Sequence, residues 1–179
     1  MTGTLDCLTS AQTKLLEEYK FQNKTFLPST FQKKPAQQET MEVVVGEWND
    51  FFLQVRRDIE QKLISGRAIL VIFKDINSLR RFAEELNKQK PNINQYHGFL
   101  ELLDEMSPAE RQSNIQKAIR PFTVTLMTRA YGRGTDFVCF DKALVKYGGV
   151  HVLTTFLPED ESEEKQIFGR TCRQDDPGS

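Results

Sequence analysis

Three strand-like runs separated by helical patterns constrain the fold of this 179-residue chain more than any other feature. They are Ala68–Phe73, Phe122–Met127 and Gly149–Phe156. The first is apolar at every position, which is typical of a strand buried on both faces of a parallel sheet. Strands that alternate with helices indicate connections that cross over such a sheet. The sequence therefore predicts an α/β fold in which a parallel β-sheet is flanked by helices on both faces.

Helical patterns lie between and around these runs. The longest has apolar residues at three- and four-residue spacing from Trp48 to Leu63, and Gly66 closes it. We expect Trp48, Phe51 and Phe52 of this helix to be core residues. Other expected elements are a capped helix over residues 11–20, a helix after Asp75 or Asn77, a short strand over 92–96, a helix over 108–119, a small unit over 141–147 and a helix from about Glu159. The acidic start of that last helix suits its positive end, and we interpret it as a solvated surface.

Residues 21–40 interrupt the alternation. They mix Pro, Lys, Gln and Thr around a short apolar patch, Phe26–Leu27, which indicates a short strand followed by a linker. The length of the chain suits one domain. We therefore expect an opening segment with its linker over residues 1–40 and a single domain over residues 41–179.

Composition argues against several classes of protein. A net charge of −1 gives no overall attraction to nucleic acid or acidic lipid. No window approaches the roughly 18 consecutive apolar residues of a membrane helix, and no signal peptide pattern opens the chain. Cys7, Cys139 and Cys172 are far apart and form no CxxC or Cys/His cluster, so we expect a reducing compartment and no metal site. We expect His151, within a strand pattern, to be a packed core or edge residue.

A glycine-rich loop, Gly132-Arg133-Gly134, follows the second strand-like run. Ligands of open α/β sheets collect at the carboxyl ends of the strands. The glycines allow close approach of the backbone, Arg133 offers a cation, and Asp136 offers an acceptor for ribose hydroxyls. A tight turn in which Arg133 and Asp136 pair with each other explains the same residues, and for this loop alone that interpretation is favoured.

A second group of polar residues lies near the end of the chain. Gln166, Arg170 and Arg173 are spaced i, i+4 and i+7, so on a helix they would share one face. The planar fork of arginine donates parallel hydrogen bonds to phosphate. An arginine that reaches a γ-phosphate across an interface stabilises the charge of phosphoryl transfer. Either arginine alone would be explained as a complement to the negative end of the helix, but the two loops together favour a phosphate site.

These segments carry a family resemblance. Gly132-Arg-Gly-Thr-Asp136 resembles motif V of the SecA preprotein translocase ATPases, which belong to helicase superfamily 2. The segment from Gln166 to Ser179 resembles their motif VI, and Met1–Leu5 is similar to the motif that opens their second motor lobe. Residues 68–87 and 148–153 resemble further elements of that lobe, so the resemblance spans nearly the whole chain.

The resemblance implies a RecA-like second motor lobe, the helicase C-terminal domain, with ATP and Mg²⁺ as cofactors bound chiefly by a first motor lobe of the same or another chain. The implied partners are that first lobe and a polypeptide substrate or translocation channel, in the cytoplasm or at the periphery of a membrane. Arg173 is implied to be the arginine finger and Arg170 a second phosphate-sensing arginine. The other implied site residues are the nucleotide contacts Gly132, Arg133, Gly134, Asp136 and Gln166 and the coupling-motif residues Thr2, Gly3 and Thr4.

The sequence departs from the family pattern at several positions. Arg129, Ala130 and Tyr131 stand where the family favours small or amide residues, and Cys172 and Asp175 each replace a glycine.

The sequence also contains neither a GxxxxGK[ST] loop nor a DExx-type acidic motif, so we expect no ATP hydrolysis by this chain alone. Because it opens within a motif and stops after motif VI, we expect a piece of a larger motor. Two alternatives stay open. One is a nucleic-acid-dependent superfamily 2 lobe, which the absence of a basic and aromatic platform argues against. The other is a non-catalytic, SecA-derived interaction module.

Overall fold

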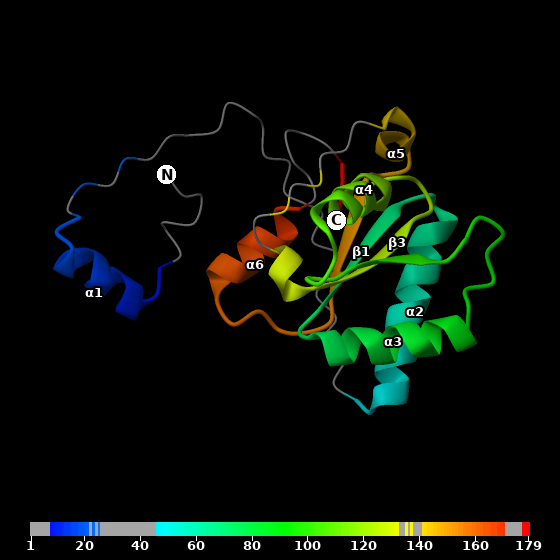
Figure 1. The fold of residues 1–179 in the computed structure, drawn as a ribbon, viewed down its shortest axis with the longest axis horizontal. Coiled ribbons are helices and arrows are strands. Elements are labelled where there is room, and N and C mark those ends of the chain that lie inside the picture. The colour runs from blue at the N-terminus through cyan, green and yellow to red at the C-terminus, as the bar shows by residue number, and fades with distance from the viewer. Residues whose placement is uncertain are drawn as a thin grey trace.

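The computed structural model describes residues 8–21, 23, 25, 46–132, 135, 137, 141–170 and 177–179. In chain order its elements are α1 (Ser10–Glu18), α2 (Trp48–Ile64), β1 (Ala68–Phe73), α3 (Ile76–Lys88), β2 (Phe99–Leu102), α4 (Pro108–Ala118), β3 (Val124–Thr128), the 3₁₀ helix η2 (Arg129–Gly132), α5 (Lys142–Lys146), β4 (Val150–Thr154) and α6 (Glu161–Phe168) (Figure 1).

The four strands form one parallel sheet in the order β2-β3-β1-β4. β1 lies in the centre and all of its residues are buried, as its continuous apolar run predicts. Ile69 of β1 lies opposite Val124 of β3 on one side and His151 of β4 on the other. The predicted α/β fold is confirmed, and the arrangement is consistent with a RecA-like domain. All four carboxyl ends lie at the same edge of the sheet.

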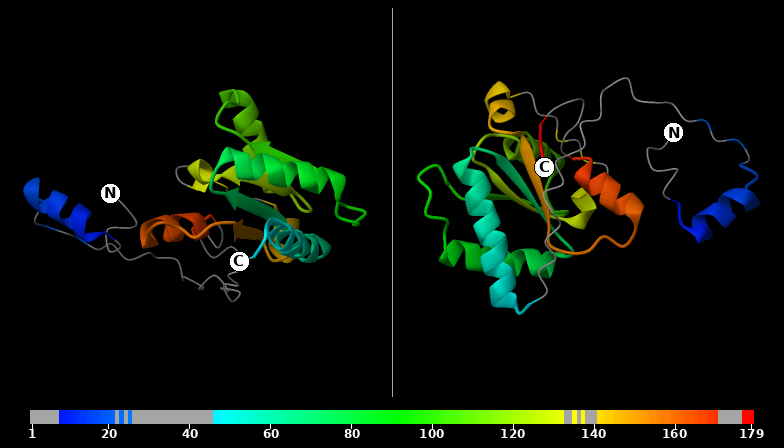
Figure 2. Two further views of the ribbon diagram at one scale, coloured as in Figure 1. Left: turned by 90° about the horizontal axis from the view of Figure 1, so that it is seen from below. Right: turned by 180° about the vertical axis from the view of Figure 1, so that it is seen from behind.

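Alternate residues of β1 point to opposite faces and enter two separate cores. Ile69, Val71 and Phe73 pack with α2 and α3 on one face. There the ring of Phe82 lies with its centre 5.2 Å from the ring centre of Phe73. On the other face the strand residues pack with side chains of α4, α5, α6 and η2. The sheet is thus a middle layer, with α2 in the foreground of the right-hand view of Figure 2.

Local side chains set the helix starts. Asp75 accepts a hydrogen bond from the backbone N–H of Ser78 and begins α3. Ser107 and Glu110 form a reciprocal capping box at the start of α4. Thr9 caps α1 in the same way, and Asp160 caps α6. The predicted starts of these four helices are therefore confirmed to within two residues, because capping depends on neighbours in sequence.

The predicted strand over 92–96 is wrong. Ile93 and Tyr96 pack against the α2–α3 core, but they lie in a turn in which the N–H of Tyr96 donates to the carbonyl oxygen of Ile93 at 3.0 Å. Two apolar residues three positions apart fit a turn rather than the two-residue period of a strand. The strand of this region forms later, at Phe99–Leu102, where it pairs with β3.

The predicted division at residue 40 falls outside the described residues and stays a prediction. α1, on its N-terminal side, has no buried residue over its described length. In the described part of the chain, no helix combines the length and the apolar character needed to cross a membrane.

Candidate functional site

The loop after β3 and helix α6 meet at the carboxyl edge of the sheet. β3 ends at Thr128, and η2 continues directly from it into contact with α6. Gly132, the last residue of η2, faces Ile167 so closely that a Cβ there would lie 3.0 Å from the Cγ1 atom. A side chain at Gly132 would force the Ile167 side chain to give by a few tenths of an ångström, so glycine favours the close packing of the two segments.

Arg170 extends from the end of α6 back to this loop. Its Nε and Nη2 atoms donate to the carbonyl oxygen of Gly132 at 3.1 and 2.8 Å, and Nη1 donates to that of Thr135. The residue is only 8% exposed. Burial lowers the pKa of Arg170, although an arginine side chain stays charged in proteins. Within the described part of the chain no carboxylate pairs with it, so the site holds a buried cation bound to neutral carbonyls.

The expectation of one helical face through Gln166 and Arg170 is wrong for the described residues. α6 ends at Phe168, and Gly169 is its C-cap. Gln166 donates to the hydroxyl oxygen of Ser162 one turn earlier at 3.3 Å and makes no described contact with the loop. Arg170 therefore lies beyond the helix. It also does not serve the negative end of α6, because its guanidinium bonds to carbonyls 35 and 38 residues earlier.

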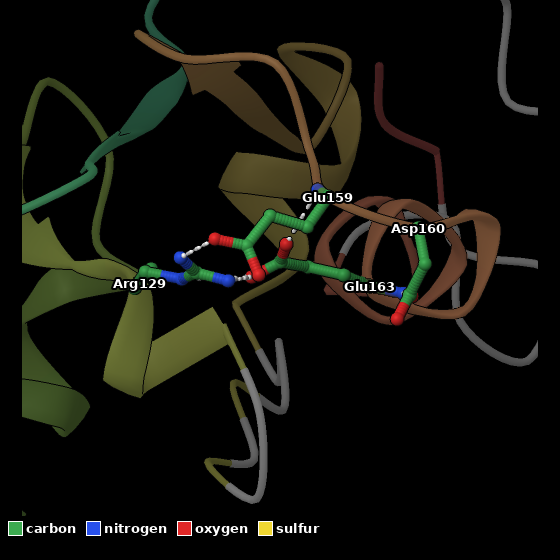
Figure 3. Close-up of polar contacts among 4 residues, drawn as sticks. All are labelled: Arg129, Glu159, Asp160 and Glu163. Carbon is green, nitrogen blue, oxygen red and sulfur yellow. Dashed lines mark hydrogen bonds and ion pairs between the residues drawn. The ribbon is translucent and has the colours of Figure 1, made fainter. Parts of the chain in front are cut away.

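Arg129, the first residue of η2, reaches the carboxylates at the start of α6 (Figure 3). Its Nη1 atom lies 2.7 Å from Oε1 of Glu159. Its Nη2 and Nε atoms lie 2.8 and 3.0 Å from Oε1 of Glu163. The other Glu163 oxygen accepts a hydrogen bond from the backbone N–H of Glu159 at 2.9 Å, and Asp160 caps the helix at the N–H of Glu163. The hydrogen bond to Glu159 and the contacts with Glu163 raise the pKa of Arg129.

The interpretation of the acidic helix start as a solvated surface is wrong for Glu163. Its side chain is 3% exposed, whereas that of Glu159 is 69% exposed. The counter-charge comes from Arg129, which lies 34 residues earlier in the chain. No local pattern reveals this partner. The sequence marks Arg129 as a departure from the resembled family, but it does not show that Glu163 is its partner.

Tyr131, another departure from the family pattern, turns into the protein. It is 4% exposed within the core on the α4–α6 face, and its hydroxyl donates to the carbonyl oxygen of Leu103 at 2.7 Å. Burial raises the pKa of this tyrosine. Its bulk therefore fills space beneath the loop.

Several predicted site residues lie outside the described part of the chain. They are Arg133, Gly134, Asp136 and Arg173, together with the coupling residues Thr2, Gly3 and Thr4. Cys7, Cys139 and Cys172 lie outside it as well. Of the predicted site residues, the structure describes Gly132, Gln166 and the phosphate-sensing Arg170, and it brings Gly132 and Arg170 into direct contact. The functional roles of all these residues stay predictions.

The last residues of the segment that resembles motif VI return to the sheet. The N–H of Val152 donates to the carbonyl oxygen of Ser179 at 2.8 Å, and the N–H of Ser179 donates to that of Val150 at 3.2 Å. His151 lies between Ser179 Oγ, 2.8 Å from Nδ1, and Asp58 Oδ2, 3.3 Å from Nε2. The expectation of a packed edge histidine is confirmed. Burial alone would raise the pKa of Asp58, but the hydrogen bond and charge of His151, together with the charges of Lys62 and Arg67, outweigh it and hold that pKa below its usual value.

A shallow cavity of ≈ 400 Å³ opens at the carboxyl ends of β1 and β4. It lies on the face of α2 and α3, and its lining residues are Gly46, Trp48, Phe51, Phe73, Lys74, Ser78 and Thr155. The guanidinium carbon of Arg81 lies 3.9 Å from the ring centre of Trp48. Phe52 is a core residue as expected, whereas Trp48 and Phe51 are only partly buried.

Known proteins resemble this chain in sequence. The SecA 2 protein translocase subunit of Bacillus anthracis is 28% identical over 179 residues, which is 100% of this chain and 21% of the relative. The SecA subunit of Halothermothrix orenii is 32% identical over 128 residues, 72% of this chain and 14% of the relative. The SecA 2 subunit of Geobacillus thermodenitrificans is 28% identical over 131 residues, 73% of this chain and 16% of the relative. This chain is similar to SecA. No family model matches it.

The similarity to SecA 2 runs through both predicted motif segments, because it covers the whole chain. The chain spans about a fifth of the length of that relative.

Proposed function

We propose that this chain is the second RecA-like lobe of a SecA-type, ATP-driven protein translocation motor. In this role it supplies an arginine-bearing edge to ATP and Mg²⁺ that are bound chiefly by a first motor lobe, in the same or another chain. Its further partners would be a polypeptide substrate or a translocation channel. It would act in the cytoplasm or at the periphery of a membrane. Similarity over the whole chain to proteins named protein translocase subunits supports this role.

One structural observation carries the proposal. The guanidinium of Arg170 binds the carbonyl oxygens of Gly132 and Thr135, so the two segments that resemble motifs V and VI are in direct contact at the carboxyl edge of the sheet. Ligands of open α/β sheets bind at this edge. A cation that is buried without a carboxylate partner in the described part of the chain is suited to receive an anion.

The donor chemistry of Arg170 fits a phosphate group. A guanidinium has five N–H donors, and three of its nitrogen atoms already donate to the loop carbonyls. Among the described residues nothing takes the remaining donor on each terminal nitrogen, and such a pair matches two phosphate oxygens. Because the carbonyl bonds fix the guanidinium, little side-chain freedom would be lost when a phosphate binds.

The residues of this chain would divide the work in the following way. Arg170 holds the loop, orients its backbone and senses a phosphate, while Arg133 and Asp136 of that loop contact the phosphates and the ribose. Gln166 contacts the nucleotide from α6. Arg173 approaches the γ-phosphate across the interface between lobes, where its charge stabilises the transition state. Thr2, Gly3 and Thr4 couple the lobes.

Complementation tests the proposal. The chain is combined with the first lobe of a SecA 2 relative, either fused or as a separate polypeptide, and ATP hydrolysis is measured for each part alone and for both together. We expect turnover only in the combination. An Arg57→Ala variant, which removes an exposed cation from α2, serves as a control and should hydrolyse ATP at the same rate.

Absence of turnover in a well-folded combination would reject the motor-lobe assignment and favour a non-catalytic module. Stimulation of ATP hydrolysis by single-stranded RNA, together with RNA binding that weakens steeply with salt, would favour the nucleic-acid-dependent alternative.

A further inference from the structure

Two arginines join the loop and α6 in opposite directions. Arg170 extends from the end of α6 to the loop carbonyls, and Arg129 extends from the start of η2 to the first turn of α6 (Figure 3). Each closes a contact between segments more than 30 residues apart in sequence. The loop and the helix are therefore fastened at both ends of their common contact, with Gly132 packed against Ile167 between the two arginines.

The two carboxylates that Arg129 meets are not equivalent. The Glu159 side chain is 69% exposed, and exposed ion pairs of this kind stabilise a protein little. The Glu163 side chain is 3% exposed, so its carboxylate has lost nearly all contact with water. Besides Arg129, its described hydrogen-bond partner is the backbone N–H of Glu159. The contact with Glu163 is thus the one on which the position of the helix start depends.

Removal of Arg129 would leave the Glu163 carboxylate buried without a counter-charge. A buried charge that loses its partner destabilises its surroundings strongly. Either the carboxylate takes up a proton, or the first turn of α6 opens and admits water, and the second response moves the helix start. Glu163 is also the residue whose N–H the cap Asp160 binds, so the same movement would break the helix cap.

We propose that Arg129 is a positioning residue whose ion pair with Glu163 makes the loop of Gly132 and helix α6 move as one body. This inference deepens the proposed function and rests on it for the mechanical consequence, namely that nucleotide contacts at the loop displace the arginine edge. Arg129 stands at a position where the resembled family favours a small or amide residue, and Glu163 supplies the matching charge in this chain.

Amide hydrogen exchange of the whole chain tests the coupling without any ATPase assay. Arg129→Gln and Glu163→Gln should each raise exchange by about tenfold in both segments, 129–132 and 161–170, and leave β1 unchanged. The double variant should exchange no faster than the faster single variant, because one interaction is lost in all three proteins. Charge exchange in R129E/E163R should restore part of the protection that Arg129→Glu alone removes.

The control variant is Glu161→Gln. It removes an acid from the same helical turn, but Glu161 is 64% exposed and pairs with Lys165 on its own helix. Its exchange should match that of the wild type. Increased exchange confined to the segment that carries the substitution would overturn the proposal, as would equal effects of Glu161→Gln and Glu163→Gln. A variant that unfolds globally would show raised exchange in β1. The conservative Arg129→Lys would then be the deciding variant. It should give both segments a protection between those of the wild type and Arg129→Gln.

The assembled motor provides the functional readout. Arg129→Gln should lower kcat by about tenfold while KM for ATP changes by less than about twofold, the pattern of an interaction that acts in the transition state. An altered KM with unchanged kcat would contradict a positioning role. If the wild-type assembly hydrolyses no ATP, the proposed function fails, while the exchange experiment still decides whether the loop and α6 are coupled.

Discussion

Substitution of Gly149 by alanine should detach the C-terminal residues from the sheet. Gly149 has φ +74°, a conformation that costs an alanine about 1–2 kcal/mol. Its new Cβ atom would also overlap the carbonyl oxygen of Pro177, which is a backbone atom and cannot rotate away. Residues 177–179 would have to move and lose two backbone hydrogen bonds between Ser179 and β4, each worth about 1 kcal/mol. The expected loss in the free energy of unfolding is therefore about 3–4 kcal/mol.

Gly148 provides the matched control. Its φ is +94°, but a Cβ atom there would lie 3.7 Å from Cδ of Arg67, an ordinary contact. Gly148→Ala should cost only the conformational strain of about 1–2 kcal/mol. Urea unfolding of both variants measures the difference, which isolates the docking of the C-terminal residues. Equal losses in the two variants would show that this docking adds no stability and would refute the reasoning.

Three further perturbations test other parts of the structure. Arg170→Met leaves two loop carbonyls without their donors and should lower the free energy of unfolding by about 1–3 kcal/mol in urea, whereas a loss within the error of the measurement would contradict the observed bonding. Ser107→Ala removes the α4 cap and should cost about 1 kcal/mol, seen as a lower Tm, and an unchanged Tm would argue against the capping box. Because the pKa of Asp58 is lowered in the folded protein, its stabilising contribution is complete above its unfolded pKa and is lost as pH falls through the folded one. Below about pH 4, the urea midpoint of the wild type should therefore decrease as the pH decreases, and that of Asp58→Asn should decrease less steeply. Parallel pH profiles of the two proteins would contradict this assignment.

The elements that could be predicted from sequence are those whose causes are local. The buried central strand β1 follows from six consecutive apolar residues. The starts of α3 and α4 follow from Asp75 and Ser107, whose side chains bond to backbone N–H groups three residues later. The loop after β3 was located for the same reason, since a glycine-rich segment follows a recognisable strand.

The features that could not be predicted depend on contacts between distant residues. The burial of Glu163 depends on Arg129, and nothing near Glu163 in sequence distinguishes it from its exposed acidic neighbours. The position of β2 depends on its pairing with β3. Residues 99–102 make this pairing, whereas the apolar residues 93 and 96 do not. The spacing of Gln166 and Arg170 predicted a shared helical face, but Gly169 ends α6 first and frees Arg170 to reach the loop.

The most direct test of the central claim is the rate of ATP hydrolysis by the complemented motor carrying Arg173→Ala. If this chain supplies the arginine finger, the variant should bind ATP but turn it over about 10³-fold more slowly than the wild type, or slower still. Turnover equal to that of the wild type would contradict the assignment of Arg173 and, with it, the view of this chain as the arginine-bearing lobe of a motor.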